Sequence, residues 1–115
     1  RQIWVHAESS DTFIVAVVVP NIHERARVLY IPLATVDPVE LCKLPEATSA
    51  VKAELEHIAG SHRLPDFFFI RAVLLEPEPF TIEAGLVTPT FKLKRAALRS
   101  KYALQINELR ASLAP

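Results

Sequence analysis

The sequence predicts a small α+β domain, in which a sheet that begins with an N-terminal hairpin is flanked by helices. Near the N-terminus, two runs rich in β-forming residues are separated by only a short polar segment. Further along, two longer stretches carry apolar residues at helical spacing. The chain has 115 residues, half of them apolar, which is enough for one hydrophobic core and not for two. We therefore expect residues 1–115 to form a single domain.

The first two elements are expected to be the strands of the hairpin. Gln2–Ala7 reads as a short strand, and Glu8–Asp11 is a polar turn. Thr12–Val19 is β-branched almost throughout and ends before Pro20. Because this second strand is apolar on both faces, we expect it to lie in the centre of the sheet.

Two short helices are expected next. The first is His23–Leu29, in a segment with little regular pattern. The second has a clear start, because Asp37 can cap the free N–H groups, Pro38 suits the first helical position and Glu40 completes a capping box. This helix is expected to end at about Leu44.

Glu46–Ala59 is the first long helix that the pattern predicts. Gly60 follows it as the expected C-terminal cap. Phe67–Leu75 is then an apolar strand, which the next prolines end. The helix carries one apolar stripe, formed by Ala47, Val51, Leu55 and Ile58.

The C-terminal third is expected to hold a short extended piece at Phe80–Ile82, a turn at Gly85 and a last helix, Arg95–Leu113. The buried stripe of this helix would be Leu98, Tyr102, Ile106, Leu109 and Leu113, and its outward residues Arg99, Lys101 and Gln105.

The bulk properties exclude several classes of function. The formal net charge is zero, so no whole-protein field favours nucleic acid or an anionic membrane. The single cysteine, Cys42, cannot form an internal disulfide, which favours a reducing compartment. Phe13–Pro20 is too short to span a bilayer.

Most groups capable of chemistry are expected to be structural. The four histidines form no metal-binding pattern, and His57 and His62 do not share a helical face. Cys42 reads as a half-buried helix thiol. Glu76 and Glu78 alternate with prolines and read as solvated loop charges. Two glycines in the whole chain exclude a glycine-rich phosphate loop.

A basic cluster at the start of the last helix is the exception. It consists of Lys92, Lys94, Arg95, Arg99 and Lys101. A solvated helix start is the simplest interpretation. However, cations at a helix N-terminus oppose the helix dipole, which normally favours acids there. The cluster therefore suggests an anionic ligand such as phosphate.

The sequence around this cluster resembles a known family. The stretch GLVTPTFKLKRAALRSKY, residues 85–102, is similar to the closing motif of AMP-forming long-chain acyl-CoA synthetases, members of the adenylate-forming superfamily. Residues 2–21 and 74–95 resemble the first hairpin and the final segment of that family's C-terminal domain. Residues 22–66 match mainly in their layout of helices. The chain departs from other branches of the superfamily at Phe91, where they carry glycine, and from the family at Arg110, where tyrosine is frequent.

The resemblance implies a mobile C-terminal domain of a long-chain fatty acid–CoA ligase, with the hinge and the N-terminal domain that binds ATP and fatty acid upstream of Arg1. The parent enzyme would use ATP, Mg²⁺ and CoA to convert a fatty acid into acyl-CoA, AMP and pyrophosphate. The catalytic lysine of adenylation falls on Lys92. Lys94, Arg95 and Arg99 are candidates for contacts with phosphates of the nucleotide or of CoA. This chain alone is expected to be inactive and to bind no cofactor.

An alternative from a different class is an autonomous interaction module, whose basic helix start binds an anionic partner. The absence of methionine and the abrupt start at Arg1 favour the first interpretation. It implies an intracellular enzyme, in the cytoplasm or on the cytoplasmic face of a membrane, with no nucleic-acid partner. Chain-length preference, membrane association and oligomeric state stay open at this point.

Overall fold

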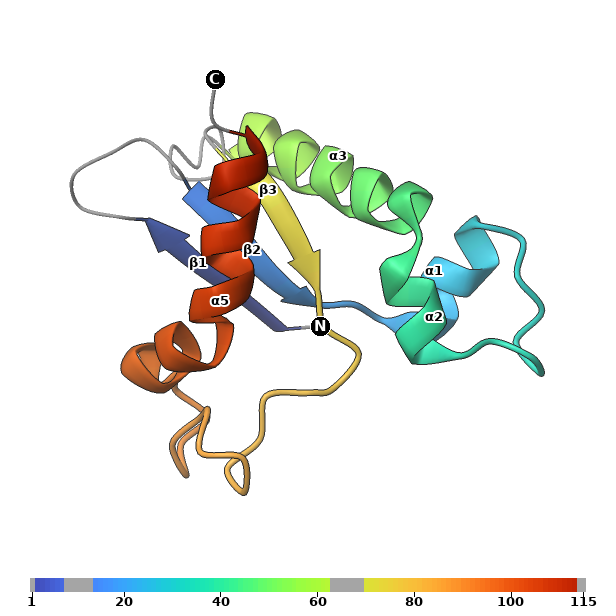
Figure 1. Cartoon of the computed structure of the whole chain (residues 1–115). Coiled ribbons are helices and arrows are strands. Elements are labelled where there is room, and N and C mark those ends of the chain that lie inside the picture. Colours follow the sequence, from blue (N-terminus) through green and yellow to red (C-terminus); the bar gives the residue numbers. More distant parts are fainter. Residues whose placement is uncertain (1, 8–13, 63–69, 114–115) are drawn as a thin grey trace. The chain divides into compact units, whose positions relative to one another are not determined.

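The computed structural model describes residues 2–7, 14–62 and 70–113 (Figure 1). The chain divides into two compact units, residues 1–78 and residues 79–115. The first unit holds a sheet and three helices, and the second holds two loops and the last helix. No helix within the described ranges is long and apolar enough to cross a membrane.

The sheet of the first unit has three strands in the order β1-β2-β3, which confirms the α+β class and the central place of the second strand. Strand β1 (Gln2–Ala7) pairs antiparallel with β2 (Ile14–Val19), and β2 pairs parallel with β3 (Ile70–Leu75). The antiparallel register runs from Gln2 opposite Val19 to Ala7 opposite Ile14. The predicted turn at Glu8–Asp11, the first residues of the predicted second strand and Phe67–Phe69 lie outside the described residues.

Both faces of β2 are buried, as its apolar sequence predicted, because Val15, Ala16, Val17 and Val18 expose none of their surface. On one face, Ala16 and Val18 join a core with side chains of α3 and β3. Other members of this core are Val51, Leu55, Ile70 and Val73. Burying each of its valine, leucine and isoleucine side chains stabilises the fold by roughly 1.5–3 kcal/mol. Trp4 on β1 is also buried.

Helix α1 (Ile22–Val28) begins at Asn21, whose side chain accepts a hydrogen bond from the N–H of Glu24 at 3.2 Å. It ends in a Schellman arrangement, in which the N–H groups of Tyr30 and Ile31 donate to the carbonyls of Arg27 and Ala26. This motif needs a left-handed residue, usually glycine, and here it is Tyr30 with φ of 60°.

Helix α2 (Pro38–Lys43) starts where the sequence predicted, but Glu40 does not complete the predicted capping box. Among the described residues, Glu40 lies 3.7 Å from Lys43 and accepts no hydrogen bond from the N–H of Asp37. The Asp37 carboxylate accepts a hydrogen bond from the N–H of Val39 at 2.9 Å, and Pro38 lies in the first turn. Helix α2 ends at Leu44, so α3 (Pro45–His62) follows almost directly.

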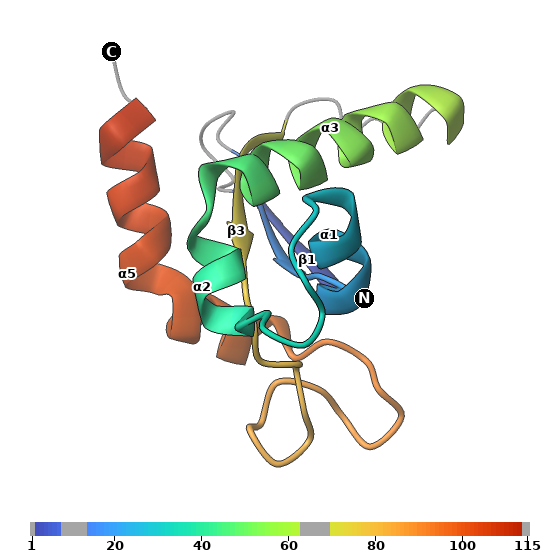
Figure 2. The same cartoon turned by 90° about the vertical axis from the view of Figure 1, so that its right-hand side faces the viewer.

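Helix α3 is longer than predicted, because Gly60 lies inside the helix rather than capping it. A glycine caps a helix only where its backbone turns left-handed, and Gly60 is not among the residues with positive φ. Three residues of the predicted stripe, Ala47, Val51 and Leu55, are buried, and the fourth, Ile58, is half-buried. A part-buried ion pair of 2.7 Å joins Arg25 of α1 to Glu54 of α3 (Figure 2 shows both helices).

The second unit consists of two loops and α5 (Arg95–Leu113), whose bounds match the prediction. Phe80–Ile82 forms no strand; Ile82 instead starts a turn, which ends at Gly85 with φ of 75°. The Phe80 ring lies edge-on to the Tyr102 ring of α5, with centroids 6.4 Å apart. In the predicted stripe of α5, Leu98, Tyr102 and Ile106 are buried and Leu109 is half-buried, while the side chain of Leu113 lies outside the described residues. The loops project beyond the start of α5 (Figure 2).

Candidate functional site

Residues 86–94 form a small hydrogen-bonded hairpin directly before α5. The N–H of Phe91 donates to the carbonyl of Thr88 at 2.7 Å, which closes a turn with Pro89 in its second position. The N–H of Thr88 donates to the carbonyl of Lys92 at 2.8 Å, and Val87 pairs antiparallel with Leu93. These bonds hold the backbone of Lys92 in place.

Two threonine hydroxyls strengthen the tip of this hairpin. The hydroxyl of Thr88 accepts a hydrogen bond from the N–H of Lys92 at 3.1 Å. The same hydroxyl lies 3.0 Å from that of Thr90. The Thr-Pro-Thr string therefore helps to fix the backbone of Lys92. These hydrogen bonds of the two hydroxyl groups were not predicted from the sequence.

Phe91 closes the turn in a left-handed conformation, with φ of 64°. A three-residue hairpin connection commonly ends in such a residue, and glycine adopts it with least strain. This geometry explains why glycine suits the position in other branches. The Phe91 side chain nevertheless stays 75% exposed.

The structure places the Lys92 side chain on the surface at the end of the hairpin. Its ammonium group makes no ion pair within the described part of the chain, while its backbone is held at both N–H and C=O. A fixed backbone with an unpaired charge suits a side chain that acts on a group brought to it from outside.

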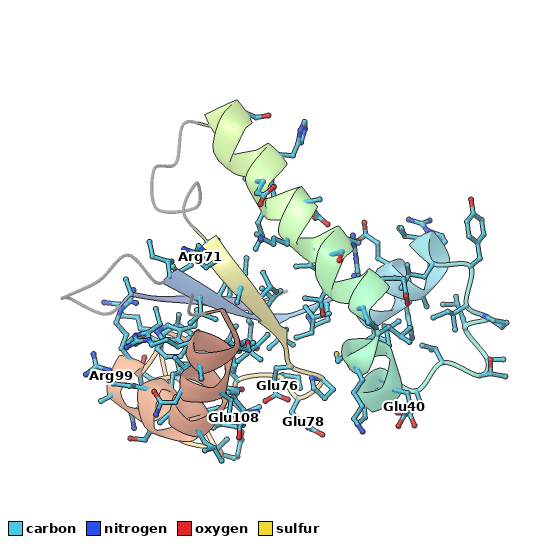
Figure 3. The ribbon with its side chains drawn as sticks, turned by 45° about the horizontal axis from the view of Figure 1, so that its top comes forward. Glu40, Arg71, Glu76, Glu78, Arg99 and Glu108 are labelled. Carbon is cyan, nitrogen blue, oxygen red and sulfur yellow. The ribbon has the colours of Figure 1, made fainter. Side chains whose placement is uncertain are left out.

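Lys94, Arg95 and Arg99 surround the start of α5, and all three are exposed. Lys94 occupies the cap position, since its carbonyl accepts the N–H of Leu98 at 3.0 Å. Arg95 and Arg99 are one helical turn apart and share a face. The first turn holds no acid, so positive charge gathers beside Lys92 (Figure 3 shows Arg99 projecting from α5). Lys101 instead lies over the Tyr102 ring, at 5.4 Å.

The Cys42 thiol is partly buried on α2, as the sequence predicted. Burial, with a smaller contribution from the charge of Glu76, raises the pKa of this thiol to about 11. A nucleophilic cysteine needs the opposite shift, because the thiolate is the reactive form. Cys42 therefore lacks the lowered pKa that is typical of a nucleophilic cysteine.

Glu76 and Glu78 lie in the loop after β3 (Figure 3). The N–H of Glu78 donates to the Glu76 carboxylate at 3.3 Å, and Glu78 is exposed. This is a local loop contact rather than a pair of catalytic carboxylates around a cleft. In the described ranges, no three metal-ligating side chains come together either.

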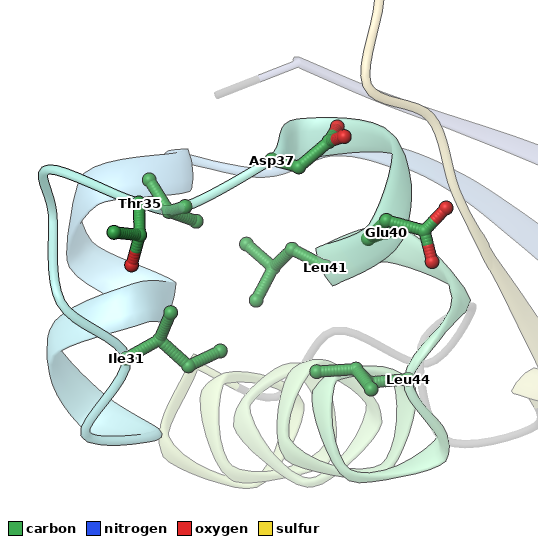
Figure 4. Close-up of a pocket in the computed structure, with 7 residues that line it drawn as sticks. Ile31, Thr35, Asp37, Glu40, Leu41 and Leu44 are labelled. Carbon is green, nitrogen blue, oxygen red and sulfur yellow. The ribbon is translucent and has the colours of Figure 1, made fainter.

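A hollow of about 270 Å³ lies between α2, the loop before it and the start of α3 (Figure 4). Its carboxylates point away from the apolar side chains Ile31, Leu41 and Leu44 (Figure 4). Asp37 caps α2, and Glu40 is exposed and lies 3.7 Å from Lys43. The hollow thus offers apolar surface without a converging polar group.

Known proteins resemble this chain over nearly its whole length. It is 40% identical to a probable CoA ligase of Humulus lupulus over 93% of the chain and 38% identical to long chain acyl-CoA synthetase 1 of Arabidopsis thaliana over 99%. Long-chain-fatty-acid–CoA ligase 1 of Cavia porcellus is 33% identical over 97% of the chain. The chain spans only 16–17% of the length of these relatives. No family model matches.

Solved structures of other enzymes resemble the fold of this chain. The adenylation and carrier-protein didomain of a carboxylic acid reductase from Segniliparus rugosus, solved with AMP, matches 98% of this chain with a TM-score of 0.75 and 28% identity. This chain covers 14% of that protein. The adenylation domain of a carboxylate reductase from Mycobacterium chelonae matches 96% of the chain, with a TM-score of 0.73.

Replacing Thr88 with valine is expected to loosen the hairpin, because the N–H of Lys92 loses its hydroxyl acceptor. Loss of one hydrogen bond of about 1 kcal/mol would speed amide exchange at Lys92 by about fivefold. Exchange measured by NMR checks this. Thr88→Ser keeps the hydroxyl and should retain protection. Equal exchange in all three proteins would contradict the role of the hydroxyl.

Cys42 is expected to resist alkylation at neutral pH, because its raised pKa keeps the thiol protonated. Its reaction with iodoacetamide should accelerate only as the pH approaches about 11. The unfolded thiol loses its proton earlier, so folding stability should fall as the pH rises from about 9 to about 11. Rapid alkylation of the folded chain at pH 7 would contradict this assignment.

Proposed function

Because the chain belongs to the family of acyl-CoA synthetases and CoA ligases, we propose that it is the mobile C-terminal domain of a long-chain fatty acid–CoA ligase. In this proposal Lys92 supplies the positive charge for the adenylation step. The observation that carries the proposal is the unpaired, exposed ammonium group on a hydrogen-bonded hairpin.

In the first half-reaction, the fatty acid carboxylate attacks the α-phosphorus of ATP and pyrophosphate leaves. Two negatively charged groups must approach each other, and charge builds up on the phosphoryl oxygens. An ammonium group placed between carboxylate and phosphate attracts both and stabilises that charge. Lys92 transfers no proton in this step, so a permanently charged side chain suits it.

In the second half-reaction, the thiol of CoA attacks the acyl carbonyl of the acyl-adenylate, the acyl–oxygen bond breaks and AMP leaves. No carboxylate approaches phosphate in this step, so it does not need the charge of Lys92. A domain that moves can withdraw the hairpin and leave room for CoA. This withdrawal would break few contacts within the chain, because the Lys92 side chain forms no ion pair with the described residues.

The remaining basic side chains are proposed as phosphate contacts. Lys94, Arg95 and Arg99 are exposed around the start of α5, where no acid neutralises them. Arginine binds phosphate oxygens through paired N–H groups, whereas lysine acts as a point charge. We assign Mg²⁺ to none of the described residues, which offer no cluster of ligands.

The partner in this proposal is the rest of the same polypeptide, which would bind ATP and fatty acid. The relatives are about six times longer than the aligned segment, which supports this partner. The solved adenylation domains that share the fold also contain much more chain than the matched region.

Replacing Lys92 with alanine in the full-length enzyme is expected to abolish most adenylation and spare thioester formation. Adenylation, measured as fatty-acid-dependent pyrophosphate exchange, should fall by about 10²–10³-fold, because the charge that stabilises the transition state is lost. Thioester formation from preformed acyl-adenylate and CoA should change by less than about twofold.

Lys43→Ala is the matched control, because it removes an exposed lysine that forms only a surface ion pair. Both half-reactions should keep their rates. If Lys92→Ala also leaves both rates near wild type, the proposed role of Lys92 is wrong, and the basic cluster is better interpreted as a docking surface for an anionic partner.

Replacing Arg95 with glutamate is expected to separate stability from function. An acid in the first turn of α5 suits the helix dipole and should raise the free energy of unfolding by a few tenths of a kcal/mol. The same change should raise KM for ATP or for CoA, because it repels phosphate. Denaturation of the chain and kinetics of the full enzyme measure the two effects. If KM is unchanged for both ATP and CoA, Arg95 does not contact the phosphates of either substrate.

A further inference from the structure

Phe91 is held in a conformation that costs stability in two ways. Its φ of 64° lies in the left-handed region, where a side chain with a Cβ is strained and glycine is not. Its ring is 75% exposed, so it leaves a large apolar surface in water. Glycine at this position would avoid both costs.

Among the described residues, no aromatic ring and no cation lies against the Phe91 ring. The only hydrogen bond of Phe91 within this part of the chain is the one that its backbone N–H donates to Thr88. The turn itself does not require the ring, because the closing bonds come from the backbone and from the hydroxyl of Thr88.

We infer that Phe91 is the positioning residue that anchors the Lys92 hairpin on the rest of the enzyme during adenylation. In this role its ring packs into an apolar site on the remaining part of the same polypeptide. The inference rests on the proposed function. We propose this remaining part as the partner of the ring, because the relatives are much longer than this chain, which spans only 16–17% of their length.

An anchor at Phe91 would define the position of the Lys92 ammonium group. The Lys92 side chain is long and flexible, so its charge alone does not define where the ammonium group sits. Phe91 is the preceding residue, and the hairpin bonds on both sides make the two residues move together. A phenylalanine ring buries much apolar area while ordering only two torsions, so it fixes the backbone of Lys92 at small entropic cost.

The test compares both half-reactions in the full-length enzyme with Phe91→Asn. Asparagine accepts the left-handed conformation, so the hairpin should persist without the ring. Pyrophosphate exchange should fall by about 10- to 100-fold, in kcat rather than in KM for ATP or fatty acid, because the ammonium group is misplaced. Thioester formation from preformed acyl-adenylate should stay within about twofold, and Tm should be equal or higher.

Tyr30→Asn is the matched control. Tyr30 is also an aromatic residue with left-handed φ, and it is 95% exposed, but it ends α1. Its replacement removes the same kind of strain and the same kind of surface, and adenylation should be unchanged. Phe91→Tyr keeps the ring and should retain at least half of the wild-type adenylation rate.

Several outcomes would overturn the inference. These are full adenylation in Phe91→Asn, an equal loss in both half-reactions, an equal loss in Tyr30→Asn, or a rise in KM alone, which would mark a substrate contact. Lys92→Ala run in parallel separates this inference from its premise. If Lys92→Ala loses adenylation and Phe91→Asn does not, only the anchor is wrong. If Lys92→Ala keeps adenylation, the proposed function is wrong.

Discussion

The burial of β2 on both faces and along both edges is the constraint on which the first unit depends. A strand with a neighbouring strand at each edge and side chains buried on both faces leaves no room for a polar side chain, so its sequence is IVAVVV. Because β3 runs parallel to β2, the chain has to return to the start of the sheet between them. The segment that makes this return contains α1, α2 and α3, and α3 supplies the cover for one face.

The second unit differs from the first because its key side chain, Lys92, is charged and stays exposed. Its hairpin is held by backbone bonds and by the hydroxyl of Thr88. Such a loop keeps its shape through short-range polar contacts, whereas the sheet depends on apolar contacts between residues far apart in sequence. Local bonding also lets the Lys92 side chain stay exposed, since the hairpin needs no contact from it. In the proposed function, the rigid backbone of the hairpin places the Lys92 ammonium group precisely. The hairpin can also be withdrawn easily, because this group makes few contacts that have to break.

Features set by one residue type or by short-range spacing could be predicted from the sequence. The Asp37–Pro38 start of α2 and the limits of α5 belong to this group. Features set by bonds between distant residues could not, and the buried pair of Arg25 and Glu54, 29 residues apart, is an example. The prediction that Gly60 caps α3 was wrong, because glycine permits a left-handed conformation without requiring it.

For the candidate site, the motif predicted where Lys92 lies, and the structure adds how its backbone is held. The left-handed Tyr30 and Phe91 escaped prediction for a shared reason. At both positions the surrounding hydrogen bonds impose a conformation that the residue type itself disfavours. A signal was available at Phe91 in the resemblance described above, which implies glycine at this position in other branches, because a glycine position often marks a positive φ.

The features of the second unit that lower its stability lie within a short stretch of the chain. The left-handed Phe91 with its exposed ring and the unneutralised charges at the start of α5 lie in consecutive segments. In contrast, the buried Arg25 of the first unit is paired with an acid. Since the net charge of the chain is zero, the cluster creates little field at long range, and ionic screening limits it to about 8–10 Å. A charge that acts only at contact distance can be switched on and off by moving its carrier, and the two half-reactions of the proposed function would need such a switch.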